Sequence, residues 1–297
     1  MFELIASNFC YPSYVGDSSG MLVVNEFITF QIAAVCGLVG MTLGWRGVMT
    51  KYSGFYDLPT AWNQVFWGIL LGGAFASYAD SSLFLPYYEA QLTGERTPEL
   101  NLIRLILVPL IATIGMHFLL RRKRVRKGGS QATSGWALGL AVGGMLAIVL
   151  ITRKVQTDSV GFVDVLTILL IGFFAPRVEA MITSFHGTLM LRGKRWGAIF
   201  RATFWRASSL TMFYFAWFSP LAWVFIIPPM LLVQDSAEKW VWDSVPKEGR
   251  RRWRRMQADK RREKQASARL IQAPESVLMD TESVSYTHLT LPTKLEV

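Results

Sequence analysis

The chain has 297 residues, of which 52% are hydrophobic and 18% are charged, with a mean hydropathy of +0.30. Soluble domains carry nearer a quarter of charged residues, so this composition argues against an ordinary soluble fold. The formal net charge of +10 would suit a nucleic-acid-binding protein. However, Lys and Arg gather between long apolar stretches, as in a membrane protein, so we do not expect a nucleic-acid partner.

Six apolar segments follow one another along the chain, at residues 21–45, 60–85, 101–120, 133–152, 160–176 and 208–233. A helix needs roughly 20 apolar residues to cross a hydrocarbon core of about 30 Å. The sequence therefore predicts an all-α fold, a polytopic transmembrane helix bundle of about six membrane segments, in a multi-pass protein of the cell membrane. Pro220, Pro228 and Pro229 interrupt the last segment, which we expect to be broken or re-entrant.

Four regions are expected. Residues 1–20 form a short extracytoplasmic leader, 21–235 the transmembrane helical domain, and 236–282 a basic juxtamembrane tail. The last residues read SVSYTHLTLPTKLEV, which resembles translated sequencing-adapter read-through. The resemblance implies that residues 283–297 are an artefact and that the natural C-terminus is missing or replaced. His288 is therefore excluded from any site.

The distribution of basic residues predicts the orientation. Alternate loops carry 13 Lys and Arg on one side, including the run from Arg121 to Lys127, and 3 on the other. The positive-inside rule then places the N-terminus outside and the 121–130 loop in the cytoplasm. Six crossings would return the C-terminus to the outside, although the tail is the most basic stretch. We favour a cytoplasmic tail and expect the six-span picture to fail, if anywhere, within residues 160–233.

Residues 192–206, RGKRWGAIFRATFWR, alternate basic and aromatic side chains. This pattern predicts an interfacial helix that lies against anionic lipid.

Pairs and a triple of glycines recur one helical turn apart in three segments. They are Gly40 and Gly44, Gly68 and Gly72, and Gly135, Gly139 and Gly143. Small residues four positions apart let helix backbones approach closely, which predicts helix-packing faces. Alternatively, glycine is simply common in membrane helices.

Four ionisable residues, Glu26, Asp80, Arg104 and Asp164, fall toward the outer ends of four different segments. Charge in a membrane is costly, and such residues default to a functional hypothesis. We predict that they form an outward-facing substrate or ion site in which Arg104 pairs with one or two of the acids. The alternative is interfacial snorkelling with a structural ion pair.

Other candidates are weaker. Glu179 and His186 share a helix face if the helix continues past Pro176, and His117 is expected at the interface. Two ligands do not make a metal site, and HExxH and Walker A motifs are missing from the sequence. No catalytic residue, metal or cofactor is predicted, and the chain is not expected to be an enzyme.

The leading functional hypothesis is a transporter- or channel-like protein. The alternative is a non-catalytic scaffold or assembly subunit of a homo-oligomer or membrane complex, whose basic segments bind anionic lipid or a partner. A lipid-modifying enzyme ranks third.

Overall fold

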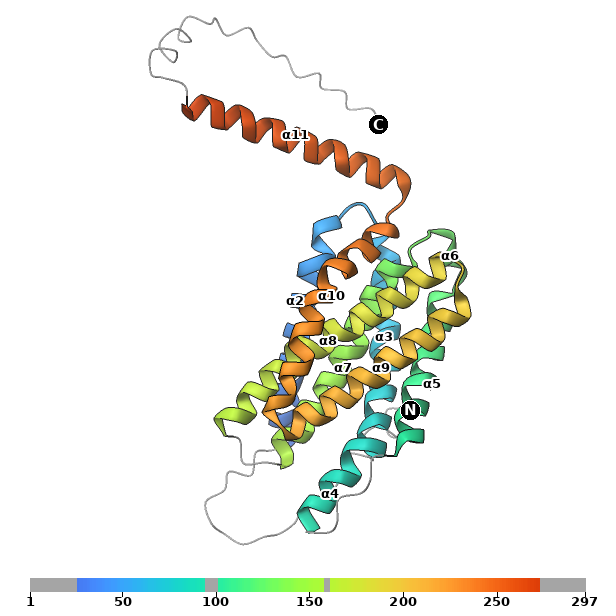
Figure 1. Ribbon diagram of the computed structural model, residues 1–297, viewed down its shortest axis with the longest axis vertical. Coiled ribbons are helices and arrows are strands. Elements are labelled where there is room, and N and C mark those ends of the chain that lie inside the picture. The colour runs from blue at the N-terminus through green and yellow to red at the C-terminus, as the bar shows by residue number, and fades with distance from the viewer. Residues whose placement is uncertain (1–25, 94–100, 158–160, 273–297) are drawn as a thin grey trace, which may run out of the picture. The chain divides into compact units, whose positions relative to one another are not determined.

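The computed structural model describes residues 26–93, 101–157 and 161–272, and all regular structure in these ranges is helical (Figure 1). The chain divides into two compact units, one that ends at Ser244 and one that begins at Val245. The first unit thus extends beyond the predicted limit at residue 235. The predicted leader, 1–20, and the predicted artefact, 283–297, lie outside the described residues.

The first unit is a bundle of long helices joined by short ones. The long helices are α2 (Glu26–Val48), α3 (Leu58–Ala79), α5 (Leu102–Leu120), α7 (Gln131–Thr157), α8 (Phe162–Leu191), α9 (Arg195–Phe218) and α10 (Trp223–Asp243). The short ones are η1 (Thr50–Tyr52), the π-helical η2 (Asp80–Phe84), α4 (Leu85–Thr93), α6 (Lys123–Lys127) and η3 (Pro220–Ala222). The second unit contains α11 (Lys247–Gln272).

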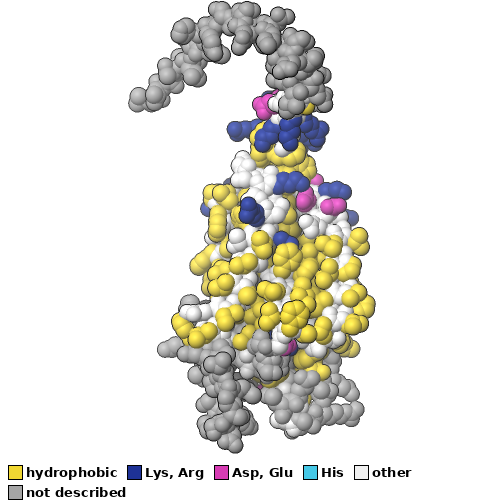
Figure 2. Space-filling model, turned by 90° about the vertical axis from the view of Figure 1, so that its left-hand side faces the viewer, with side chains coloured by type: hydrophobic (Ala, Val, Ile, Leu, Met, Phe, Trp, Pro, Cys, Tyr) yellow, Lys and Arg dark blue, Asp and Glu magenta, His cyan; other side chains and the backbone are white. Residues whose placement is uncertain are grey.

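Six of these helices are long and apolar enough to cross a membrane, which confirms the predicted all-α polytopic bundle. The outer surface agrees with this, because large apolar side chains such as Phe162 (85% exposed) and Leu232 (80% exposed) point away from the bundle. Figure 2 shows hydrophobic side chains over the middle of one face and Lys and Arg side chains at one end of it. Such a surface is stable only against hydrocarbon, so the chain is a multi-pass membrane protein.

The last predicted segment, 208–233, has the wrong boundaries. The chain turns at Ser219 and η3, so the first half of that segment completes α9 and the second half begins α10. Pro220 opens the turn, whereas Pro228 and Pro229 lie inside α10. Residues 195–206 of the stretch predicted as an interfacial helix form the first half of α9, which packs along α5 and α8.

The two ends of α9 lie at opposite ends of the bundle. Next to its start, Arg192 forms an ion pair of 3.2 Å with Asp243, the last residue of α10. At its far end, the rings of Phe218 and Tyr87 of α4 lie 4.2 Å apart. Helix α9 therefore runs the length of the bundle beside the six apolar helices. We call the end that carries α6, Arg192 and Asp243 the basic end.

With α9, seven helices run lengthwise through the first unit. The chain that leaves α10 at Ser244 is at the basic end, since the Ser244 hydroxyl oxygen accepts a hydrogen bond from the backbone N–H of Thr133. The 121–130 loop and the end of α10 are therefore at the same end of the bundle.

Helix α7 is the core of the bundle. Every residue from 131 to 152 is buried except Met145, which is partly exposed. Three of its glycines lie directly against the backbone of α8: Gly135 against Thr183, Gly139 against Glu179 and Ala180, and Gly143 against Ala175. On its other sides, Gly68 and Gly72 of α3 meet Leu138 and Val142, and Gly44 of α2 meets Leu140. Gly40 of α2 lies against Gly172 of α8.

Candidate functional site

Among the three predicted site residues whose side chains are described, Asp80 and Asp164 each form an ion pair with a residue of α7. Glu26 is the first residue of α2, and its side chain lies outside the described residues. Asp80, at the start of η2, accepts hydrogen bonds from Arg153 of α7, with distances of 2.5 Å to Nη2 and 3.3 Å to Nε. Asp164, in the first turn of α8, lies 3.1 Å from Nζ of Lys154.

Arg104 is not the partner of these two aspartates. It is exposed in the first turn of α5, where the side chain of Asn101 caps the helix. The acids pair instead with two consecutive residues, Arg153 and Lys154, at the end of α7. The predicted pairing is thus replaced by two ion pairs that hold η2 and α8 to α7 at the end opposite the basic end. We call these two pairs the outer pairs.

A second, deeper polar cluster was missed by the sequence analysis. Arg206 of α9 and Glu179 of α8 form an ion pair with 2.8 Å between Nε and Oε2, and their side chains are 0% and 2% exposed. The guanidinium also donates hydrogen bonds to the hydroxyl oxygens of Thr113 and Thr183, and it contacts the sulfur of Met116. All of its nitrogens therefore face partners inside the bundle.

The pair lies deep in the bundle. Arg206 follows the start of α9 by about 16 Å, and Glu179 precedes the end of α8 by about 18 Å, at 1.5 Å per residue. Both charges are therefore in the low-dielectric interior of the bundle, about three helical turns from the basic end. Two ions in such a medium need each other, because removal of one leaves an uncompensated buried charge that costs about 3–5 kcal/mol.

Two histidines lie between this pair and the basic end. Nδ1 of His117 and Nε2 of His186 are 3.0 Å apart, and both side chains are buried. His117 is therefore not the interfacial residue that we expected. One nitrogen in the contact must accept and the other donate, so at least one of the two rings is neutral.

Several buried atoms beside the histidines have no hydrogen-bond partner among the described residues. They are Nδ1 of His186, the hydroxyl of Ser184 and Oε1 of Gln131. Buried polar atoms without a protein partner are where internal water is usually held. Buried hydrogen-bonding groups without a protein partner are thus present where α7 and α8 approach the basic end.

The chemistry that this cluster permits is proton exchange. Glu179, His117 and His186 are titratable, and the guanidinium of Arg206 supplies a fixed positive charge. The described residues contain no group of three or more His, Cys, Asp or Glu side chains that could hold a metal ion.

Part of this buried polar cluster was predictable from the sequence. Glu179 and His186 were recognised as sharing a face, and α8 does continue through Pro176. Their partners lie 27 and 69 residues away, at Arg206 and His117. Arg206 is the last residue of the 192–206 stretch, which the sequence predicts as an interfacial helix.

Comparisons with protein-family models, with curated proteins and with solved structures find no match to this chain.

Proposed function

We propose that this protein is a proton-coupled membrane transporter, with the Glu179–Arg206 pair as its coupling group. The observation that carries the proposal is the position of this pair, fully buried near the middle of the bundle. Ionisable residues at such depth are expensive and typically mark ion pathways or proton relays. A proton that neutralises Glu179 would release Arg206, and this would weaken the contact between α8 and α9.

The histidines supply the route from the basic end to this pair. His117 and His186 are hydrogen-bonded to each other, and His186 has one ring nitrogen left for a further partner. Imidazoles transfer protons readily near neutral pH, because each ring can bind a proton at one nitrogen and release a proton from the other.

The outer pairs complete the proposed route at the other end. Asp80 and Asp164 belong to the predicted outward-facing site, and each is held by a cation of α7. We assign them the role of an outer gate that opens when either carboxylate is protonated or binds a cation. Glu26 and Arg104 begin their helices at this same end and would contribute to the entrance.

The experiment is proton flux into proteoliposomes that enclose a pH-sensitive dye, driven by a pH gradient or a membrane potential. We expect flux in the wild-type protein and at least a tenfold loss in Glu179→Gln and in Asp80→Asn. The matched control is Glu238→Gln, because Glu238 forms an ion pair with Lys51 that is partly exposed at the basic end. Absence of wild-type flux under every gradient would overturn the proposal, as would equal flux in Glu179→Gln and Glu238→Gln.

A scaffold function is the second candidate, and α11 is the observation that favours it. This helix of 26 residues is strongly basic and forms a unit of its own. Basic helices next to a membrane segment bind anionic lipid or acidic partners. Deletion of residues 247–272 should then abolish partner capture from solubilised membranes while leaving flux unchanged. Identical partners with and without α11 would argue against the scaffold.

A further inference from the structure

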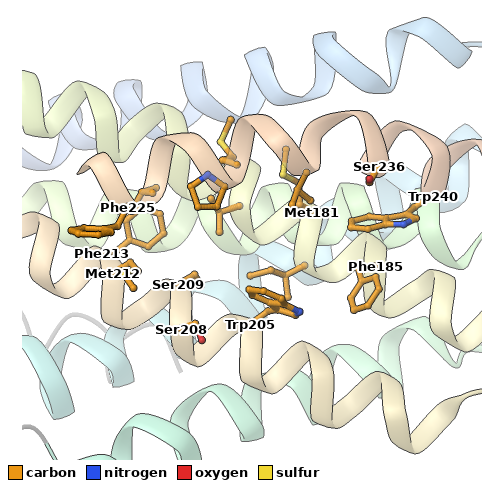
Figure 3. A pocket seen from close by; sticks show the side chains of 16 residues that line it. Met181, Phe185, Trp205, Ser208, Ser209, Met212, Phe213, Phe225, Ser236 and Trp240 are labelled. Carbon is orange, nitrogen blue, oxygen red and sulfur yellow. The ribbon is translucent and has the colours of Figure 1, made fainter. Parts of the chain in front are cut away.

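A pocket with a volume of about 420 Å³ lies between α8, α9 and α10. Figure 3 shows side chains from all three helices pointing into it, among them Met181 and Phe185 of α8, Trp205 and Met212 of α9, and Trp240 of α10. This volume is in the range of sites that bind small ligands, about 300–1,000 Å³. The pocket is separate from the Glu179–Arg206 pair, since neither residue lines it.

The lining selects for hydrocarbon. Among the described residues that line the pocket, none is charged, and the polar ones are three serines and the two tryptophan N–H groups. The hydroxyl of Ser209 already donates to the backbone carbonyl of Arg206. Pro229 of α10 is also part of the wall. A ligand with a polar centre would lose its hydration here without gaining partners, whereas an alkyl chain would not.

The pocket opens toward the lipid-facing surface. Trp205 and Phe225 belong to its lining and are 53% and 64% exposed on the outside of the bundle. Along α9, the lining from Trp205 to Phe213 covers about 12 Å, and along α10 the lining from Phe225 to Trp240 covers about 22 Å. One leaflet contributes about 15 Å of hydrocarbon, half of the core, which lies between these two lengths, so the pocket is long enough for most of one acyl chain.

A cation is placed to receive the headgroup. Arg201 is exposed on α9, one turn before Trp205 in the direction of the basic end. Residues four apart on a helix share a face, so Arg201 continues the row that lines the pocket. A guanidinium binds phosphate with two parallel hydrogen bonds. We propose that the pocket holds one acyl chain of an anionic phospholipid from the leaflet at the basic end, with its phosphate at Arg201.

Photocrosslinking tests this assignment. The purified full chain is placed in nanodiscs that contain phosphatidylglycerol with a photoreactive group in one acyl chain, and in matched nanodiscs with labelled phosphatidylcholine. We expect labelled peptides to come mainly from the pocket walls, at least fivefold above the lipid-facing surface of α5. Excess unlabelled phosphatidylglycerol should reduce the crosslinking of the pocket peptides by competition. Uniform labelling of all lipid-facing helices would contradict a specific lipid site. Crosslinks from the pocket to another protein chain, in place of lipid, would show that a helix occupies the pocket and would also contradict the proposal.

Two variants test the binding of the acyl chain and the binding of the headgroup separately. Ser209→Trp fills the pocket and should reduce pocket labelling at least fivefold, and its control is Ile106→Trp on exposed α5. Arg201→Gln should reduce labelling by phosphatidylglycerol to the level seen with phosphatidylcholine. Its control is Arg122→Gln, an arginine that stacks on Trp67 at 4.2 Å. Equal labelling by both lipids in the wild type would overturn the anionic headgroup, whether or not Ser209→Trp folds.

Discussion

Replacing Gly139 with alanine measures how tightly α7 and α8 pack at the centre of the bundle. An added Cβ would lie 2.6 Å from Cα and 2.8 Å from the nitrogen of Ala180, and it would also meet the carbonyl oxygen of Glu179. Carbon atoms normally stay about 3.5–4.0 Å apart, so the two backbones must separate by about 1 Å. Overpacking of this kind typically costs about 1–3 kcal/mol. Helix propensity acts in the opposite direction, because alanine is better than glycine by about 1 kcal/mol.

Gly73→Ala is the matched control, since the new Cβ there would meet only the terminal carbon of Met145 at an ordinary 3.5 Å. The assay is unfolding of the purified protein by a denaturing detergent, followed by tryptophan fluorescence. We expect Gly73→Ala to leave the free energy of unfolding unchanged or raise it by up to about 1 kcal/mol. Gly139→Ala has the same propensity gain but adds the overpacking cost, so its free energy of unfolding should lie about 1–3 kcal/mol below that of Gly73→Ala. Equal effects of the two substitutions would refute the tight seam between α7 and α8.

Three further outcomes are expected. Glu179→Gln alone should lower the free energy of unfolding by about 3–5 kcal/mol, because it leaves the charge of Arg206 buried without a partner. In a double-mutant cycle, addition of Arg206→Gln should recover part of this loss. Additive losses would show that the two residues are not coupled. In single-cysteine variants, Leu221→Cys at η3 and Lys247→Cys should react with a membrane-impermeant thiol reagent from opposite sides of the membrane. Labelling of both cysteines from the same side would mean that α10 does not cross the membrane. Glu238→Gln should cost no more than about 1 kcal/mol in thermal unfolding, because its ion pair is partly exposed; a larger loss would give this pair a structural role.

The bundle itself was predictable, because apolar length is a local property that the sequence displays directly. Helix α9 was missed for a local reason as well: Arg195, Arg201 and Arg206 lower its hydropathy below that of a membrane span. The structure shows why the helix tolerates them. Arg195 and Arg201 are exposed in its first turns, near the basic end, and Arg206 is neutralised by Glu179. A hydropathy window cannot detect this compensation, since the acid is on another helix.

The predicted site shows the same limit. Depth along the membrane follows from sequence position, and Asp80 and Asp164 do lie at one end of the bundle. Their partners depend on the angle at which each helix faces its neighbours. The π-helical turn of η2 begins at Asp80, and a wider turn of this kind changes the direction of every following side chain. Spacing along a regular helix therefore could not have assigned Arg153 rather than Arg104 to Asp80.

Glu179 joins the packing seam to the charged cluster. Its backbone carbonyl lies against Gly139 of α7, while its carboxylate binds Arg206 of α9. The helix that carries the acid is thus held at backbone distance on one side. On the other side it is joined to α9 by an ion pair that one proton can break and by a hydrogen bond from Arg206 to Thr183. Because α7 is buried along almost its whole length, it is the fixed part of this arrangement. Protonation of Glu179 would therefore shift α9 rather than α7, and α9 is the helix that also forms a wall of the lipid pocket.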